Sequence, residues 1–478
     1  MDNAGKTTRM SGKELLIVLV ISLGSFMAGL DATIVNIALP SIAKSFSVPT
    51  VIASWVLNAY LIILVSLLLA AAKLGDMKGY RGIFLIGFTL FTIGSALCGM
   101  APTIGLLIAF RMLQAVGGAI IAALGSVMVT SYLGSELRGQ ALGLVAMFTM
   151  LGVAMGPVIG GFLTSALSWR FIFLVNIPVG VIAILLGIFV IPRLPAIAKN
   201  SKLDIPGVIF IFIALASLIL GLNMMQGDNS STGILVLIIF AVFLSAFIIR
   251  EKRAKEPLAN LSVFRNAAYS IQNIAILILQ MGVAGVMFLM PFYLEIVKGM
   301  STGESGALLL ALPVGNILTA PIAGKISDVI GTKKPIIFGF IIAIAGLFLL
   351  STLTVNIHEG GIAVFLFILG AGAGIAYAPL NSAIMGESPE KEQGMTSGLI
   401  KMMTNLGSSL GVTFSMLIFG LVLGPEIALI SAHTIKPQQL IPGFDIAFLF
   451  CMAMQIIALV LMFLVKNKES AGNSEPVI

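Results

Sequence analysis

Four charged side chains stand inside long apolar stretches of this 478-residue chain: Asp31, Arg111, Glu295 and Lys401. A charge at the centre of a lipid-embedded helix costs roughly 2.5–3.5 kcal/mol on insertion scales, so such a residue faces the protein interior and marks an ion or substrate pathway. A carboxylate beside a guanidinium can bind and release a proton as its surroundings change. The sequence therefore predicts proton coupling at Asp31, tuned by Arg111, with Glu295 as a secondary acid.

Each of these charges also has a plainer interpretation. Asp31 and Arg111 could form a permanently ionised structural pair. Glu295 could lie in interfacial water, and Lys401 could extend its amine to the membrane surface. Depth indicates that the two are partners, because Asp31 and Arg111 lie about 10 Å and about 12 Å from the outer ends of their apolar stretches at 1.5 Å per residue. We therefore expect the two side chains to meet inside the protein, directly or through a polar bridge.

The composition indicates that these four charges belong to a membrane protein. Hydrophobic residues make up 59% of the chain and charged residues 10%, where soluble domains carry about 25% charged residues. Soluble, disordered and collagen-like classes are thereby excluded. The chain has only two cysteines, Cys98 and Cys451, and two histidines, His358 and His433. With no cluster of histidine, cysteine or carboxylate in any loop, the sequence predicts no metal, no cofactor and no enzymatic activity.

Fourteen apolar runs are long enough to cross a bilayer as helices. They are continuous rather than alternating, which excludes a strand barrel. The predicted spans are 14–37, 51–72, 82–100, 103–131, 139–164, 170–191, 205–224, 233–249, 268–297, 304–324, 335–354, 361–385, 394–424 and 443–465.

The basic residues predict the orientation of these spans. Placing the N-terminus inside leaves only four loop cations outside, namely Lys44, Arg170, Lys298 and Lys436. Cytoplasmic loops carry the excess of Lys and Arg in membrane proteins. Both termini are therefore expected in the cytoplasm, and the net charge of +7 reflects topology rather than nucleic-acid binding.

Two short turns repeat one pattern of Asp, Gly and basic residues 252 positions apart (328 − 76). Their members are Asp76, Gly79, Arg81 and Asp328, Gly331, Lys333. This offset leaves room for two helices beyond a six-helix repeat. The predicted division is a six-helix bundle at 1–200, two additional helices at 201–255 and a second bundle at 256–478, with halves that can rock against each other.

Three motifs resemble one known family. They are Leu30–Pro40 (LDATIVNIALP), Trp55–Tyr60 (WVLNAY) and Trp169–Pro178 (WRFIFLVNIP). Over essentially its whole length the chain resembles the major facilitator superfamily, in particular its fourteen-span drug:proton antiporters. The resemblance implies an all-α, monomeric, multi-pass protein of the cell membrane that exports amphipathic compounds in exchange for protons by alternating access. The alternatives are an exporter of one endogenous lipid or metabolite and, in another class, a non-transporting receptor or lipid-modifying enzyme.

Two further motifs concern movement. The Asp-x-x-Gly-basic turns resemble a loop that clasps the cytoplasmic face in this family, where the aspartate can cap a neighbouring helix. The stretch at 152–161 resembles the antiporter motif, through Gly152, Gly156, Pro157, Gly160 and Gly161. Its glycines at i, i+4 and i+8 form a smooth face for close helix packing, and its proline permits a bend. Ordinary small-residue packing is the alternative.

Polar and methionine side chains are the candidates for the substrate cavity. Flexible thioethers suit a site that accepts many shapes, and a few polar groups orient the cargo. The predicted set is Asn58, Tyr60, Gln114, Met147, Met150, Gln280, Asn316, Tyr377, Asn381, Lys401 and Asn405. Multi-cation exporters of this branch often carry acids in the thirteenth span, where this chain has Lys401, Thr404 and Asn405, which argues against dicationic substrates.

Overall fold

The computed structural model describes residues 10–196, 203–225, 230–254, 257–258, 260–389, 393–424 and 437–465, and these residues form helices without strands. Fourteen helical segments are long and apolar enough to cross a membrane, which confirms the predicted span count. Lys436, one of the four cations expected outside, is not among the described residues. His433 and both chain ends also lie outside the described part.

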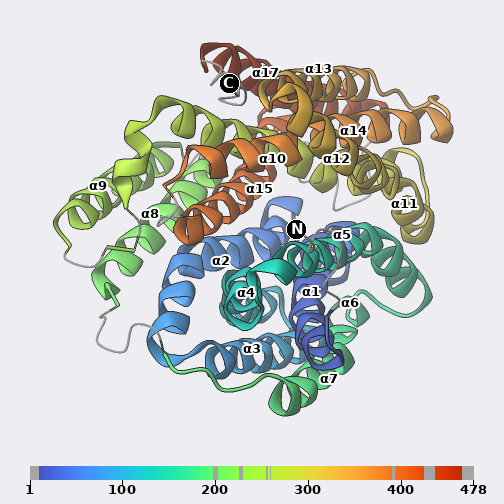
Figure 1. Cartoon of the computed structure of the whole chain (residues 1–478). Coiled ribbons are helices and arrows are strands. Elements are labelled where there is room, and N and C mark those ends of the chain that lie inside the picture. The colour runs from blue at the N-terminus through green and yellow to red at the C-terminus, as the bar shows by residue number, and fades with distance from the viewer. Residues whose placement is uncertain are drawn as a thin grey trace.

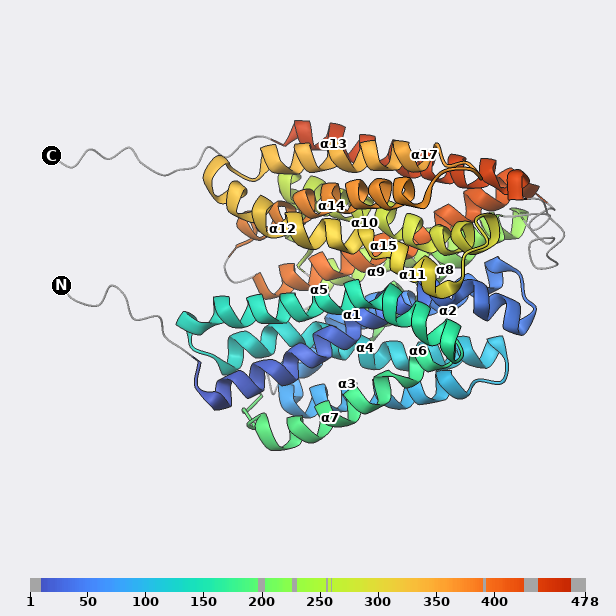
Figure 2. The ribbon, with the colours of Figure 1, turned by 90° about the vertical axis from the view of Figure 1, so that its right-hand side faces the viewer.

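The first seven helices form one side of the molecule, in the lower part of Figure 2. They are α1 (Gly12–Phe46), α2 (Thr50–Lys78), α3 (Tyr80–Met100), α4 (Ile104–Tyr132), α5 (Ser135–Ala166), α6 (Phe171–Leu174) and α7 (Asn176–Val190). Within this group α1 packs along α5, and α4 packs against both α2 and α3.

The later helices form the opposite side (Figure 2). They are α10 (Ala267–Phe292), the π-helix η3 (Tyr293–Val297), α11 (Thr302–Leu309), α12 (Ala311–Ile330), α13 (Lys333–Leu350), α14 (Glu359–Glu387), α15 (Gln393–Leu423) and α17 (Pro437–Leu464), with the 3-10 helix η2 (Leu261–Arg265) before α10. Here α10 packs along α15, and α14 packs against both α12 and α13.

Contacts between the two groups run mainly through three helix pairs: α2 with α15, α5 with α11, and α1 with α10. Between the groups in sequence come α8 (Ile205–Met224) and α9 (Ser230–Arg253). These two helices lie at the edge of the molecule in Figure 1, where α8 touches α2 and α15, and α9 packs on α8. The predicted domain boundaries at 200/201 and 255/256 fall on residues outside the described part, so the division stays a prediction.

Local sequence explains where several helices begin and bend. A capping box, in which Ser11 and Glu14 exchange side-chain and backbone hydrogen bonds, starts α1. The same arrangement at Ser301 and Glu304 starts α11. α1 extends through Pro40 to Phe46, beyond the predicted end of its span, because its last turns pack against other helices although they are less apolar. We call the end of the bundle where α1 begins the first face and the end where α1 stops the second face.

Candidate proton-coupling site

Asp31 of α1 and Arg111 of α4 meet in the interior of the first helix group. Their side chains are 0% and 1% exposed, and Nη1 of the arginine donates to both carboxylate oxygens at 2.9 Å. The predicted juxtaposition is confirmed. A bond between ionised partners is among the strongest in proteins, and burial makes the loss of either partner costly.

Gln114 completes a closed polar network around this pair. It lies one turn along α4 from Arg111, so both side chains share a helix face. Its Oε1 accepts from Arg111 Nη1 at 2.7 Å, and its Nε2 donates to Asp31 Oδ1 at 3.0 Å and to Ser95 Oγ at 2.8 Å. Gln114 is fully buried. Gln114 is a predicted residue of the substrate cavity, whereas the structure places its side chain in contact with Asp31 and Arg111.

Helix α2 holds the other side of the guanidinium. Arg111 Nε donates to the carbonyl of Val56 at 3.2 Å. The guanidinium carbon lies 4.1 Å from the centre of the Tyr60 ring and 5.6 Å from that of Phe173, a geometry in which an aromatic face attracts a cation. The Tyr60 hydroxyl also lies near the Asp31 carboxylate. The network therefore joins α1, α2, α3 and α4. A change of charge at Asp31 would alter contacts that involve all four helices.

The antiporter-like glycines bring α5 directly onto α1. A Cβ atom on Gly152, Gly156 or Gly160 would overlap the Phe26 carbonyl, the Thr33 hydroxyl or the Ile37 side chain of α1, respectively. Thr33, two residues beyond Asp31, donates to the Val153 carbonyl of α5 at 3.0 Å. One helix thus carries the buried carboxylate and a smooth contact with its neighbour.

The adjacent face of α5 meets the other helix group. A Cβ atom on Gly161 would lie 2.6 Å from the Thr302 carbonyl of α11, and one on Gly306 of α11 would overlap the Pro157 carbonyl. The five residues of this motif therefore serve two contacts, one within the first group and one between groups.

Glu295 lies at the second face, in the π-helix that follows Pro291. Its Oε1 is buried and has no hydrogen-bond partner among the described residues, although Lys44 of α1 and Thr302 interact with the carboxylate. π-helical turns occur frequently at functional sites. Asp445 of α17 also has a buried carboxylate oxygen without a described partner. Sequence reasoning missed Asp445, although an acid in the apolar run 443–465 was a visible signal.

Two predicted cavity residues form contacts between the helix groups. Asn58 of α2 is buried and accepts from Ser409 Oγ of α15 at 3.3 Å. Lys401 of α15 donates through Nζ to the Ala122 carbonyl of α4 at 2.6 Å and to Ser126 Oγ at 3.4 Å.

The remaining predicted cavity residues are not joined in one cluster by the contacts of the described residues. Asn381 and Asn405 donate to the carbonyls four residues earlier, at 2.9 Å and 2.8 Å. Asn316 has a buried Oδ1 without a described partner. Met147 is 49% exposed on α5. Met150, Gln280 and Tyr377 are half-buried.

The two repeated turns place their residues in equivalent ways. Gly79 and Gly331 have φ of 90° and 81°, a conformation that favours glycine. Arg81 donates to the Ile188 carbonyl near the end of α7, and Lys333 donates to the Phe463 and Val465 carbonyls at the end of α17. A cation at a helix C-terminus opposes the helix dipole, so each group is fastened at the first face between its third and last membrane-spanning segments.

The aspartates of these turns differ from the expected pattern. Asp76 accepts from the Tyr80 hydroxyl of α3 at 2.6 Å. Within the described residues its partner is thus a side chain rather than the helix amides that the sequence suggested. Asp328 lies exposed near the end of α12.

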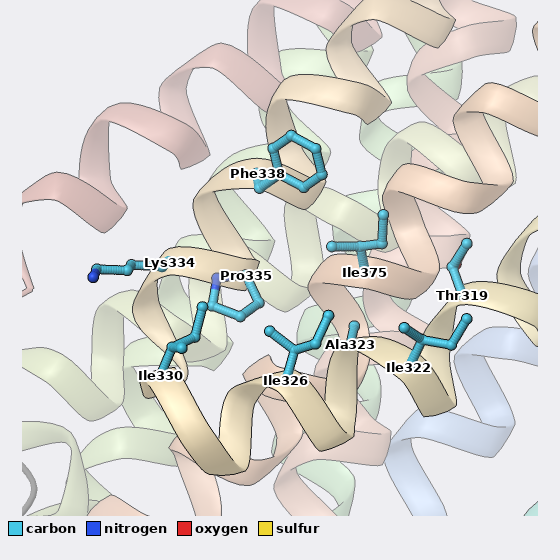
Figure 3. A pocket seen from close by; sticks show the side chains of 9 residues that line it. All are labelled: Thr319, Ile322, Ala323, Ile326, Ile330, Lys334, Pro335, Phe338 and Ile375. Carbon is cyan, nitrogen blue, oxygen red and sulfur yellow. The ribbon is translucent and has the colours of Figure 1, made fainter.

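A cavity of about 390 Å³ lies apart from this site, between α12, α13 and α14 (Figure 3). Its lining is apolar except for Thr319 and Lys334, and it includes none of the predicted proton or substrate residues. It is therefore a side groove of the second helix group.

Comparison with known proteins identifies the family and the fold to which this arrangement of helices corresponds. The Major Facilitator Superfamily matches residues 21–412. A bacterial homolog of the human lysosomal transporter Spinster, solved in an inward-facing and unoccupied conformation, superposes with a TM-score of 0.67 at 16% identity, covering 95% of this chain and 97% of that one. The nucleoside transporter NupG gives a TM-score of 0.64 at 12% identity. These likenesses establish the fold.

Curated relatives are nearer in sequence. The riboflavin transporter RibZ of Clostridioides difficile (strain 630) is 33% identical over 402 residues, 84% of this chain and 87% of RibZ. The tetracenomycin C resistance and export protein of Streptomyces glaucescens is 31% identical, over 84% of this chain and 75% of its own length. The multidrug transporter protein MdtP of Bacillus subtilis (strain 168) is 29% identical, over 84% and 74%. The chain therefore belongs to the major facilitator superfamily of membrane transporters, among relatives that include multidrug exporters.

Proposed function

We propose that the protein exports amphipathic small molecules from the cell in exchange for protons, by alternating access. The observation that carries this proposal is the buried network of Asp31, Arg111 and Gln114. A carboxylate held this deeply in a membrane helix marks an ion pathway, and the relative named as a tetracenomycin C resistance and export protein supports the direction of transport.

Asp31 would carry the proton. When its carboxylate is ionised, it accepts bonds from Arg111 and Gln114. Protonation removes the negative charge that balances Arg111, and a buried cation without a counter-ion is strongly unfavourable. The proton therefore favours a different arrangement of the four joined helices. Proton binding can shift the equilibrium between the two arrangements by at most the difference in their affinity for the proton.

The helix contacts provide surfaces along which such a change could occur. At its closest points to α1, α5 presents glycines, so no side chain of α5 obstructs movement there. We expect the bundles 1–200 and 256–478 to rock about the α2–α15 and α5–α11 contacts, with 201–255 riding beside them and both termini in the cytoplasm. Two-bundle transporters of this kind move largely as rigid halves around a fixed site.

A second candidate is the export of one particular metabolite. It is supported by the relative named as a riboflavin transporter, at 33% identity over 84% of this chain. The two candidates share the proton mechanism and differ in selectivity. A narrow response in a panel of metabolites and drugs, measured as thermal stabilisation of the purified protein, would favour this second candidate.

The test of proton exchange uses the purified chain in sealed vesicles that contain a pH-sensitive dye. Compounds that stabilise the protein are added under zero membrane potential. We expect each transported compound to move protons in the opposite direction. Transport without any proton movement would contradict the proposal. Proton-coupled transport that persists in Asp31→Asn vesicles would transfer the carrier role to Glu295.

A further inference from the structure

Lys401 is a charged residue within a predicted membrane span that the proposed proton mechanism does not use. It lies eight residues after the start of α15 at Gln393, or about 12 Å from that end at 1.5 Å per residue. Its side chain is half-buried and crosses from the second helix group to the first, where Nζ contacts the Ala122 carbonyl and the Ser126 hydroxyl of α4.

Neutral oxygen atoms are thus the partners of this ammonium. The ion pairs among the described residues are Asp31 with Arg111 and Asp204 with Arg250, so Lys401 belongs to neither. Asp31 already accepts from Arg111 and Gln114. A cation in a low-dielectric setting that is bonded to neutral oxygens rather than to an anion keeps part of its desolvation penalty.

The α4 side of this contact can be given up readily. Ala122 and Ser126 are four residues apart within α4, so the Ala122 carbonyl also accepts the helical N–H of Ser126. When the ammonium leaves, that carbonyl keeps its backbone partner, and a serine hydroxyl can bond to the carbonyl one turn earlier. The ammonium, in contrast, needs a new acceptor wherever it moves.

The surroundings on α15 suit an amphipathic cargo. Met402 and Met403 follow Lys401 directly, and the Asn405 side chain donates to the Lys401 carbonyl. Two turns along, at Ser409, α15 contacts Asn58 of α2. At the junction of the two groups, α15 therefore contributes the Lys401 ammonium, with the Asn405 amide one turn further along and the Ser409 hydroxyl two turns along.

From this arrangement we infer that Lys401 recognises an anionic group on the exported compound, and that the compound takes the place of the α4 oxygens on Nζ. The inference rests on the proposed export function and specifies its substrate class: apolar bodies that carry a carboxylate, sulfonate or comparably charged acceptor. Binding of such a group would also release the Lys401 contact between α4 and α15, which ties substrate binding to separation of the two helix groups.

The test uses three matched fluorescent probes that differ in charge: dansylglycine (anionic), dansylglycinamide (neutral) and dansylcadaverine (cationic). Binding to the purified full-length protein is measured by fluorescence titration without any pH gradient. We expect dansylglycine to bind about 10- to 100-fold more tightly than dansylglycinamide, the range of one hydrogen-bonded charge contact. Dansylcadaverine should bind most weakly.

Variants assign the preference to the residue. Lys401→Met should remove it and Lys401→Arg should keep it, whereas Lys252→Met, a change of an exposed lysine on α9, should leave it unaltered. Equal affinity of the three probes, absent binding of dansylglycine, or an anion preference that survives in Lys401→Met overturns the inference. Because no proton gradient enters this assay, its failure is separate from failure of proton exchange, which the vesicle experiment measures.

Discussion

The two helix groups resemble each other in how their helices pack. They differ in whether their buried charged side chains form ion pairs. In the first group, the close contact of α5 with α1 is made by Gly152 and Gly156. In the second, Gly407 and Gly411 of α15 meet the Leu277 and Met281 carbonyls of α10, as Gly152 meets the Phe26 carbonyl of α1. These pairs occupy matching places in the two halves, as the repeated turns at Asp76 and Asp328 predict.

Their charged residues have diverged. Asp31 and Arg111 neutralise each other in the first group, whereas Glu295, Asp445 and Lys401 of the second group belong to no ion pair among the described residues. A closed hydrogen-bond network can hold one small ion in a fixed geometry. Charged side chains outside ion pairs can instead bind a variable cargo. Under the two proposals above, Asp31 of the first group would carry the proton and Lys401 of the second group would meet the cargo.

The largest expected effect comes from breaking the closed network. Arg111→Met leaves the Asp31 carboxylate buried without its partner, and should lower the free energy of unfolding by about 3–5 kcal/mol. Denaturant titration in detergent measures it. Asp31→Asn added to Arg111→Met should restore part of the loss, because the neutral amide no longer needs a cation. An unchanged stability in Arg111→Met would mean that the pair contributes nothing.

The shared packing predicts a second, smaller effect that should be equal in the two halves. Gly156→Ala and Gly411→Ala each place a methyl group against a neighbouring helix and should destabilise by about 1–3 kcal/mol. Gly143→Ala is the matched control on α5, since nothing lies within 4 Å of its added Cβ. A loss at Gly156 alone would argue against equivalent interfaces.

The acids of the second group that belong to no described ion pair predict a third, still smaller effect on the free energy of unfolding. Glu295→Gln and Asp445→Asn remove carboxylates that have a buried oxygen without a described partner, so neither breaks an ion pair of the kind found at Asp31. We expect each to change the free energy of unfolding by less than about 1 kcal/mol. Thermal unfolding of the two variants beside Arg111→Met checks this. A loss as large as that of Arg111→Met would erase the contrast between the halves.

The smallest effect is expected in α8 and α9. Asp204 and Arg250 form an ion pair with N–O distance 2.9 Å, in which the arginine is 45% exposed. Exposed pairs contribute little, and the proposed mechanism does not involve these helices. Export by Arg250→Gln should therefore stay within about twofold of wild type. Loss of transport in this variant would show that α8 and α9 take part in the cycle.

Much of the architecture could be predicted because long apolar runs and buried charges are strong signals. The fourteen spans and the meeting of Asp31 with Arg111 followed from length, depth and the penalty for a lone charge in lipid. The surroundings of the pair depended on helix rotation, which one sequence does not specify. Gln114 was therefore assigned to the cavity, and Ser95 carried no signal that distinguished it from other small polar residues.

Two helix interruptions were missed for a related reason. The spans 170–191 and 304–324 are each divided, between α6 and α7 and between α11 and α12. Both stretches are apolar throughout their interruption, so hydropathy shows no boundary there. The partners of Lys401 were equally hidden, because they lie on α4, 275 and 279 residues away in sequence.

The central claim, that Asp31 is the proton carrier, is tested most directly by comparing two modes of transport in Asp31→Asn vesicles. In net export, a pH gradient drives a labelled substrate; in counterflow, unlabelled substrate exchanges for labelled substrate without a gradient. The amide keeps the shape of the side chain and much of its hydrogen bonding but cannot carry the proton. We expect net export to fall to the protein-free background while counterflow continues. Net export at the wild-type rate in Asp31→Asn would contradict the account and make Asp31 a structural residue.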